Sequence, residues 1–255
     1  MSLKNSSVKI KIPKLLQEKL NIKKIGQIYK KFEKTLNIKE DFIVAVSGGP
    51  DSLALAFLAK IYSIKNRIKS NYFIIDHKLR PESTKEAKIV KNILKKYLIN
   101  SEILTWKGKK PNKNIQSLAR KKRYELLFGQ CDKLKTNNIL LGHHRDDLFE
   151  NFFIRILRGS GLKGLISFDK KRTFVNKNLL RPLLSQKKED LLFLSKTVFN
   201  FYVQDPTNED EKYQRIKVRK LIKELKKNGL DEKKFFKTIE NLKSSNIVID
   251  HYVRQ

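Results

Sequence analysis

A continuous apolar run that ends in a glycine-containing hexapeptide is the feature that most constrains this chain. Residues 42–46 (FIVAV) lead directly into Ser47-Gly-Gly-Pro-Asp-Ser52, and apolar residues with helical spacing follow. A short, wholly apolar run is typical of a parallel strand buried on both faces of its sheet. The glycines allow a tight turn, and Pro50 suits the first turn of a helix, where its missing N–H costs nothing. The sequence therefore predicts a buried strand, a tight turn and a helix.

The same pattern recurs along the chain. Strand-like runs at 72–76, 102–106 and 139–142 alternate with helical spacing at 53–64, 82–98, 115–134 and 146–157. Such alternation predicts an α/β fold with a doubly wound, mostly parallel sheet. Right-handed crossovers would place the loops at the carboxyl ends of these strands along one edge of the sheet.

We expect three parts in the chain. Residues 1–40 are interpreted as a basic N-terminal arm with a helix near 24–36, and residues 41–205 as the α/β domain. Within that domain, 174–184 could hold one or two short strands and 187–198 a helix. Asp205-Pro-Thr-Asn208 is a turn signal that we take as the boundary. Residues 206–255 would form a short basic helical tail with helices near 212–227 and 232–242.

The charge balance narrows the class of partner. The 255 residues contain 57 Lys and Arg against 26 Asp and Glu, a formal charge of +31. Such a charge favours a polyanion, and nucleic acid above all, although drift in a Lys-rich composition is the alternative. A single cysteine, Cys131, excludes an internal disulfide and a metal site built from several thiolates. No apolar run approaches the length of a membrane helix and no secretory signal is present, so we expect a soluble, cytoplasmic protein without a membrane partner.

The hexapeptide has the properties of a phosphate cradle. Backbone N–H groups can approach an anion without obstruction from Cβ atoms, the serines add hydroxyl donors, and the following helix presents its positive end. The sequence is neither GxxxxGK[ST] nor GxGxxG. An ordinary helix cap is the alternative, but it would need only one such residue.

SGGPDS in this setting resembles the signature of the PP-loop ATP pyrophosphatases, which bind the pyrophosphate end of ATP and cleave between its α- and β-phosphates. Further stretches resemble, in order and spacing over about residues 40–220, the motifs of the tRNA(Ile)-lysidine synthase family. They are Asp76-His-Lys-Leu-Arg80, Ala119-Arg-Lys-Lys-Arg-Tyr124, Gly142-His-His-Arg-Asp-Asp-Leu-Phe-Glu150, Arg158-Gly-Ser-Gly161, Arg181-Pro-Leu-Leu184 and Asp205-Pro-Thr-Asn208.

The resemblance implies a reaction. An ATP-dependent ligase would adenylate O2 of the wobble cytidine of a tRNA(Ile) with a CAU anticodon, releasing pyrophosphate. The ε-amine of L-lysine would then attack C2 and expel AMP, giving lysidine. Lysine's amine has a reference pKa near 10.4, so it must lose a proton before it attacks. The tRNA would have to be selected by the catalytic domain and the short tail, which predicts weaker discrimination against other tRNAs.

The resemblance also implies the site residues. ATP and Mg²⁺ would be the cofactors, and the catalytic residues would include Asp51, with Asp147 and Glu150 gripping lysine's amines or accepting a proton. Asp51 or Asp146 would bind the metal, and Arg215, together with Arg219, would hold the activated nucleotide or the tRNA. The residues expected to bind ATP are Ser47, Gly48, Gly49, Pro50, Asp51, Ser52, Asp76, Arg120, Arg123 and His143. Ordinary alternatives are acids favoured by a helix N-terminus, a structural histidine and solvated helix charge.

Other functions compete with this interpretation. A tRNA thiolase of the same superfamily would generally need several cysteines or an iron–sulfur cluster, and an amidotransferase-type synthetase would need a glutaminase partner. A non-enzymatic RNA-binding protein explains the charge but neither SGGPDS nor the acidic helix that contains Asp147. Such a protein would bind RNA without consuming ATP.

Overall fold

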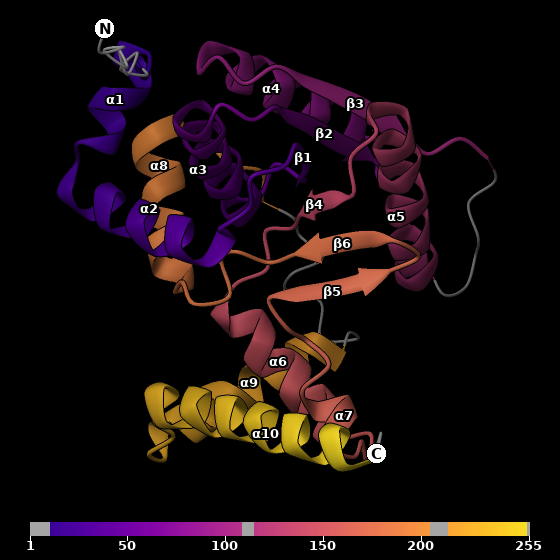
Figure 1. The fold of residues 1–255 in the computed structure, drawn as a ribbon. Coiled ribbons are helices and arrows are strands. Elements are labelled where there is room, and N and C mark those ends of the chain that lie inside the picture. Colours follow the sequence, from indigo (N-terminus) through magenta and orange to yellow (C-terminus); the bar gives the residue numbers. More distant parts are fainter. Residues whose placement is uncertain (1–10, 109–114, 205–213, 254–255) are drawn as a thin grey trace, which may run out of the picture.

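The computed structural model describes residues 11–108, 115–204 and 214–253, which form a six-stranded sheet flanked by helices (Figure 1). The strand order is β3-β2-β1-β4-β6-β5. The strands are β1 (Phe42–Val46), β2 (Ser70–Asp76), β3 (Ser101–Thr105), β4 (Asn138–Leu140), β5 (Lys171–Phe174) and β6 (Lys177–Leu180). The helices are α1 (Lys14–Leu20), α2 (Lys23–Leu36), α3 (Pro50–Asn66), α4 (Ser83–Lys96), α5 (Ile115–Leu134), α6 (Arg145–Ile156), α7 (Leu162–Leu165), α8 (Lys188–Phe199), α9 (Gln214–Lys227) and α10 (Glu232–Val253).

The sheet confirms the predicted fold class. Strand β1 pairs in parallel with β2 and β4, β2 with β3, and β4 with β6. Only β5 runs antiparallel, forming a hairpin with β6 at the sheet edge. The uncertain region predicted at 174–184 is thus this hairpin, which begins at Lys171. The carboxyl ends of β1, β2, β4 and β6 lie along one edge, and the loops that follow them meet there.

Helices cover both faces of the sheet. One core cluster joins α2, α3, α4 and α8 to one face, and nearly every residue of α3 from Leu53 to Ile61 is buried in it. A second cluster on the other face includes Ile43, Leu127 and Cys131 and is covered by α5. Because α3 is apolar all round, it is buried on all sides, which fixes its N-terminus against the sheet edge.

The N-terminal segment is more closely integrated than the predicted basic arm. Residues 14–36 form two helices rather than one, and Leu16, Ile25 and Phe32 are fully buried in the main core. The reason is the amphipathic pattern of α2, whose apolar residues recur at helical spacing and pack on the sheet-covering layer. Its lysines remain on the outer face.

The C-terminal helices α9 and α10 pack with α6 and α7 below the sheet (Figure 1). Their shared cluster contains Leu148, Phe149 and Phe152 of α6 together with Val218 and Ile239. The residues predicted to form a short basic helical tail complete the core around α6. The proposed boundary, Asp205-Pro-Thr-Asn208, lies outside the described residues. Across the described ranges, no helix is long and apolar enough to span a membrane.

Candidate active site

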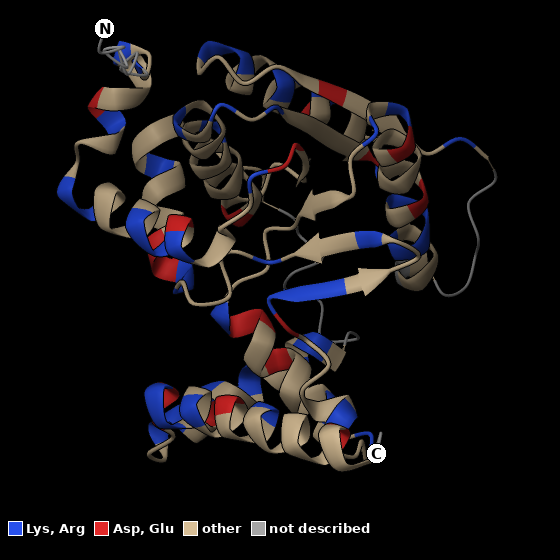
Figure 2. Cartoon of the chain, in the orientation of Figure 1, with Lys and Arg blue, Asp and Glu red and all other residues tan. Residues whose placement is uncertain are grey.

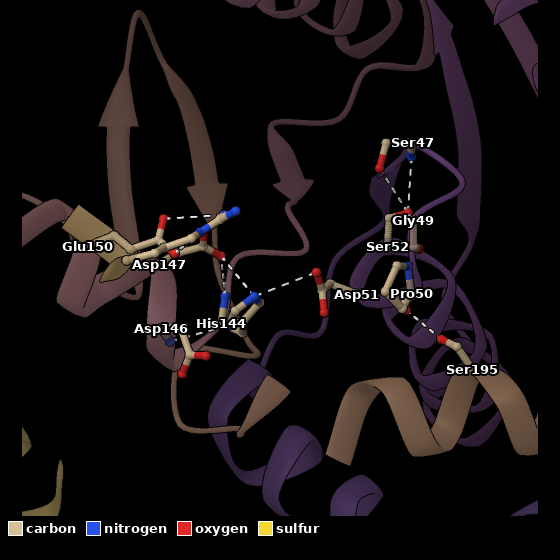
Figure 3. Close-up of polar contacts among 11 residues, drawn as sticks. Ser47, Gly49, Pro50, Asp51, Ser52, His144, Asp146, Asp147, Glu150 and Ser195 are labelled. Atoms are coloured by element: carbon tan, nitrogen blue, oxygen red, sulfur yellow. Dashed lines mark hydrogen bonds and ion pairs between the residues drawn. The ribbon is translucent and has the colours of Figure 1, made fainter. Parts of the chain in front are cut away.

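The hexapeptide forms a closed turn at the N-terminus of α3. Ser52 Oγ accepts a hydrogen bond from the Ser47 N–H at 3.1 Å and donates to the Gly49 carbonyl at 2.9 Å (Figure 3). Pro50 occupies the first turn of α3, where its missing N–H is harmless. The turn thus points the N-terminus of a 17-residue helix into the loop edge of the sheet, an arrangement suited to an anion.

Two glycines in this region have no room for a side chain. Gly48 has φ +86°, and a Cβ there would lie 2.7 Å from Val90 Cγ2 and 3.0 Å from Val203 Cγ2. The Val203 N–H also donates to the Gly48 carbonyl. Gly142, after β4, would place a Cβ 3.2 Å from the Ser52 backbone nitrogen. The turn is therefore held between α4, the segment after α8 and the loop after β4.

His144 connects the hexapeptide to α6. Its Nε2 lies 3.6 Å from Oδ2 of Asp51 and 3.5 Å from Oδ2 of Asp147, so the ring stands between the two carboxylates (Figure 3). Its Nδ1 accepts the Asp146 N–H at 3.2 Å, and Asp147 accepts the His144 N–H at 3.0 Å, a reciprocal cap of α6. An accepting Nδ1 leaves the proton of the neutral ring on Nε2, facing both carboxylates.

The pKa values of the two carboxylates shift in opposite directions. Burial raises the pKa of Asp51, and His144 only partly opposes this effect. Burial alone would also raise the pKa of Asp147, but His144, whose N–H donates to this carboxylate, and the charge of Arg215 bring it below its usual range. Asp51 Oδ1 is buried without a hydrogen-bond partner among the described residues. That bare carboxylate oxygen, at the anion-binding end of α3, fits a hard cation such as Mg²⁺, which prefers oxygen ligands.

Glu150 lies one turn along α6 and pairs with α9. It is 3% exposed, and its Oε1 accepts a hydrogen bond from Arg219 Nε at 2.6 Å. Burial raises the pKa of Glu150 despite this contact. The pair borders a cavity of about 160 Å³, which Asp146, Lys188 and Lys223 also line. Both signs of charge therefore face a space the size of a small molecule.

A larger cavity of about 360 Å³ lies over the hexapeptide. Ser47, Asp51, Arg123, His143 and Asp147 line it, together with His77 from the end of β2. Burial lowers the pKa of His143 to about 3 and that of His77 to about 4, so both rings are neutral near pH 7. Nδ1 of His143 and both ring nitrogens of His77 are buried and unpartnered within the described part of the chain, available to a ligand.

Three predicted site residues lie elsewhere or are engaged otherwise. Asp76 accepts hydrogen bonds from the Lys78 N–H and from Ser83 and Thr84, and so fixes the turn before α4. Asp146 lines the smaller cavity, and Arg120 lines neither. The charge of Arg215 contributes to the lowered pKa of Asp147, and at Glu150 it opposes the larger effect of burial. Over the described residues, no group of three or more His, Cys, Asp or Glu side chains could hold a metal by itself.

Sequence reasoning placed His143 in the site but missed its neighbour His144. The signal was present, because His144 directly precedes α6 and Asp147 follows three residues later, the spacing of a capping box. Lys188, which lines the smaller cavity from the first turn of α8, carried no such signal in the sequence.

Comparison with known proteins places this geometry in a family. Residues 17–225 match the family described as PP-loop domain. A tRNA(Ile)-lysidine synthase of Orientia tsutsugamushi is 42% identical over 71% of this chain and 41% of its own length. One from Bradyrhizobium diazoefficiens is 32% identical over 82% of this chain and 58% of its own. The chain thus spans about half the length of the curated relatives it matches.

A solved structure shares the fold. The U34-tRNA thiolase NcsA from Methanococcus maripaludis, solved with its [4Fe-4S] cluster, superposes with a TM-score of 0.71 at 19% identity. The match covers 87% of this chain and 78% of the thiolase. At this identity the likeness concerns the fold alone.

Proposed function

The chain belongs to the PP-loop domain family, and from that premise we propose that it uses ATP to ligate L-lysine to the wobble cytidine of a tRNA(Ile) with a CAU anticodon. The single observation that carries this proposal is the contact of Asp51 and Asp147 through His144, which joins the hexapeptide to the acidic face of α6. An anion site and an ammonium site are thereby neighbours. Curated relatives named tRNA(Ile)-lysidine synthase support the choice of substrates. These substrates would place the reaction in the cytoplasm.

The larger cavity is our proposed ATP site. The hexapeptide N–H groups and the N-terminus of α3 would hold the pyrophosphate end, together with Arg123, which also lines this cavity. We assign Asp51 to Mg²⁺, because its Oδ1 is buried and has no partner among the described residues. Bound Mg²⁺ would neutralise charge on the leaving pyrophosphate. Cytidine O2 would attack the α-phosphorus, the bond to the bridging oxygen would break, and pyrophosphate would leave.

The smaller cavity is our proposed lysine site. Free lysine carries two ammonium groups and one carboxylate, and the cavity offers Asp146 and Glu150 beside Lys188 and Lys223. The ε-ammonium would point toward Asp147 and Glu150, where a carboxylate can accept its proton. The freed amine would attack C2 of the adenylated base, and AMP would leave with the former O2. Because its pKa is raised, Glu150 is the better matched of the two as a proton acceptor.

Product analysis of the nucleotide tests this proposal. Purified chain with Mg·ATP, lysine and a CAU tRNA should convert ATP to AMP and pyrophosphate, and AMP should appear only when all three substrates are present. A thiolase would instead consume ATP independently of lysine and require a sulfur donor. If the chain binds the tRNA but consumes no ATP, the proposed ligase activity is wrong and the chain is an RNA-binding protein.

A further inference from the structure

A ladder of flat side chains runs along the face shared by α5 and the β5–β6 hairpin. The Arg120 guanidinium lies 5.5 Å from the Tyr124 ring centroid. The Tyr124 and Phe128 ring centroids lie 5.9 Å apart with 31° between the rings, and Phe128 stacks on Phe174 at 6.0 Å and 29°. We call these four residues the aromatic ladder. Three of its members recur every four residues on one face of α5, and the fourth comes from the hairpin.

The ladder is open to solvent. Phe174 is 50% exposed, Arg120 is exposed, and Tyr124 and Phe128 are only partly buried. Rings that serve the core alone are normally covered, as Phe32 and Phe57 are in this chain at 0% exposure. Tyr124 and Phe128 also pack against the core cluster beneath α5, but each keeps part of its ring at the surface, where a flat ligand could contact it.

Cationic side chains border the ladder on the sheet side. Arg172 pairs across the hairpin with Leu179, which packs with Leu127 of α5, so Arg172 lies on the α5 face. Arg181 is buried at 2% exposure, and burial, together with Arg120 and Arg172, lowers its pKa. Its Nη1 donates to the Asp169 carbonyl, whereas the Asp169 carboxylate pairs with Lys243 of α10 at 2.9 Å. Three guanidinium groups thus gather without a carboxylate partner among the described residues.

The hairpin carries one sign of charge. From Lys170 to Arg181 the sequence has no acidic residue, and Figure 2 shows blue and no red on both of its strands. The inner end of this surface reaches the candidate site, because the Arg181 guanidinium lies 4.5 Å from the Phe168 ring centroid, and that ring packs against His143 of the larger cavity at 5.2 Å. Lysines alone on an edge strand would be ordinary protection against aggregation. Here stacked aromatic rings accompany guanidinium groups.

We propose that the aromatic ladder with Arg172 binds unpaired RNA nucleotides next to the target base. This proposal rests on the proposed function, because it takes RNA as the substrate. Every base has a π-face, so successive rings provide a stacking platform, while guanidinium groups pair with the phosphodiesters between the bases. The surface would lead a single strand from the tip of the hairpin toward His143.

Two exposed positions with matched controls test the proposal. The variants are F174A and R172A, and their controls are Y252A and K91A, which remove an exposed aromatic ring on α10 and an exposed cation on α4. The probe is the anticodon stem–loop of a CAU tRNA, titrated against the full chain at several salt concentrations. A fully paired RNA duplex of equal length serves as the second probe.

The two variants should weaken RNA binding in different ways, one in affinity and the other in salt dependence. We expect F174A to bind the stem–loop at least about five-fold more weakly with an unchanged salt slope, because it removes stacking and no charge. R172A should lower the slope by about 0.7, the value for one phosphate contact on a single strand. The controls should stay within about two-fold, and duplex affinity should depend little on Phe174. F174L, which keeps an apolar side chain against Phe128, separates loss of stacking from loss of folding.

The proposal would be overturned if F174A and Y252A lost equal affinity for the stem–loop. It would also be overturned if the affinity of R172A depended on salt as that of K91A does. Wild-type chain that fails to bind the stem–loop would overturn it too. The proposed function is judged separately, by AMP formation. If the chain binds the stem–loop through the ladder but makes no AMP, the proposed RNA-binding surface is supported and the proposed ligase activity is contradicted.

Discussion

His144 Nε2 lies 3.6 Å from Oδ2 of Asp51, although 93 positions along the chain separate the two residues. The same nitrogen lies 3.5 Å from Oδ2 of Asp147, and Nδ1 of the same ring accepts the Asp146 N–H and so caps α6. One side chain therefore sets both the start of the acidic helix and its position against the hexapeptide turn. Loss of this ring should therefore have two effects that can be measured apart, one on the stability of α6 and one on catalysis.

Two substitutions at His144 should separate those roles. H144A removes the helix cap and should lower the free energy of unfolding by about 1 kcal/mol. H144N supplies another good cap and should restore most of that stability. It cannot stand between Asp51 and Asp147, however, so we expect AMP formation to fall at least about ten-fold. Urea titration and the AMP assay measure the two effects, and an H144N variant with wild-type turnover would contradict the assigned role.

Gly48 should not tolerate alanine. Its φ of +86° and the 2.7 Å approach to Val90 Cγ2 predict that G48A lowers the free energy of unfolding by about 1–3 kcal/mol. At Gly129, within α5, an added Cβ would meet no atom within 4 Å, so G129A should stabilise the chain by about 0.5–1 kcal/mol. Thermal unfolding of G48A and G129A measures both effects. The double variant G48A/V90A should recover part of the lost stability, because V90A removes the Cγ2 atom that the new Cβ would approach. Equal effects at the two glycines would show that the turn is not tightly packed.

Removing Arg219 should destabilise the chain more than removing Glu150, although the two form one ion pair. The side chain of Glu150 is 4% exposed and that of Arg219 is 35% exposed. R219A leaves a buried carboxylate without its partner and should cost about 3–5 kcal/mol at pH 7.5. E150A leaves a guanidinium that water can reach, so its cost should be clearly smaller. Chemical denaturation of both variants measures the difference, and an E150A variant less stable than R219A would be inconsistent with this geometry.

His143 should make the stability depend on pH. Its pKa falls from the ordinary value of 6.5 to about 3 on folding, so the unfolded chain binds more protons between these values. The free energy of unfolding should therefore decrease as pH falls below 6.5, by at most about 1.4 kcal/mol per pH unit from this group. H143Q should remove that contribution, whereas H251Q, at an exposed position of α10, should keep it. Urea titrations at several pH values measure the slopes. Identical slopes in wild type and H143Q would mean that His143 is not held neutral.

The sequence was most informative where periodicity and turn chemistry agree. The wholly apolar strand β1, the hexapeptide and the apolar α3 follow one another without interruption, so their order and their edge of the sheet could be predicted. The acids of α6 could also be located, because α6 follows a strand of the same sheet. The antiparallel direction of β5 could not, since four exposed residues carry no buried pattern that would fix their pairing.

Contacts between distant segments were beyond the reach of sequence patterns. The packing of α9 and α10 on α6 depends on Val218 and Ile239, which look like ordinary apolar positions of basic helices. Likewise, Asp76 is predicted to bind ATP at a strand end, and the hydrogen bonds that it accepts from Ser83, Thr84 and the Lys78 N–H could not be foreseen. Which carboxylates remain open to a ligand depends on such tertiary contacts.

The mass of the wobble nucleoside tests the central claim most directly. The chain is incubated with Mg·ATP, lysine and a CAU tRNA, the tRNA is digested, and the wobble nucleoside is weighed by mass spectrometry. The account predicts a cytidine heavier by one lysine less one water, formed only in the presence of ATP and lost in D147A and E150A. An unmodified cytidine, with the chain folded and the tRNA bound, would contradict it.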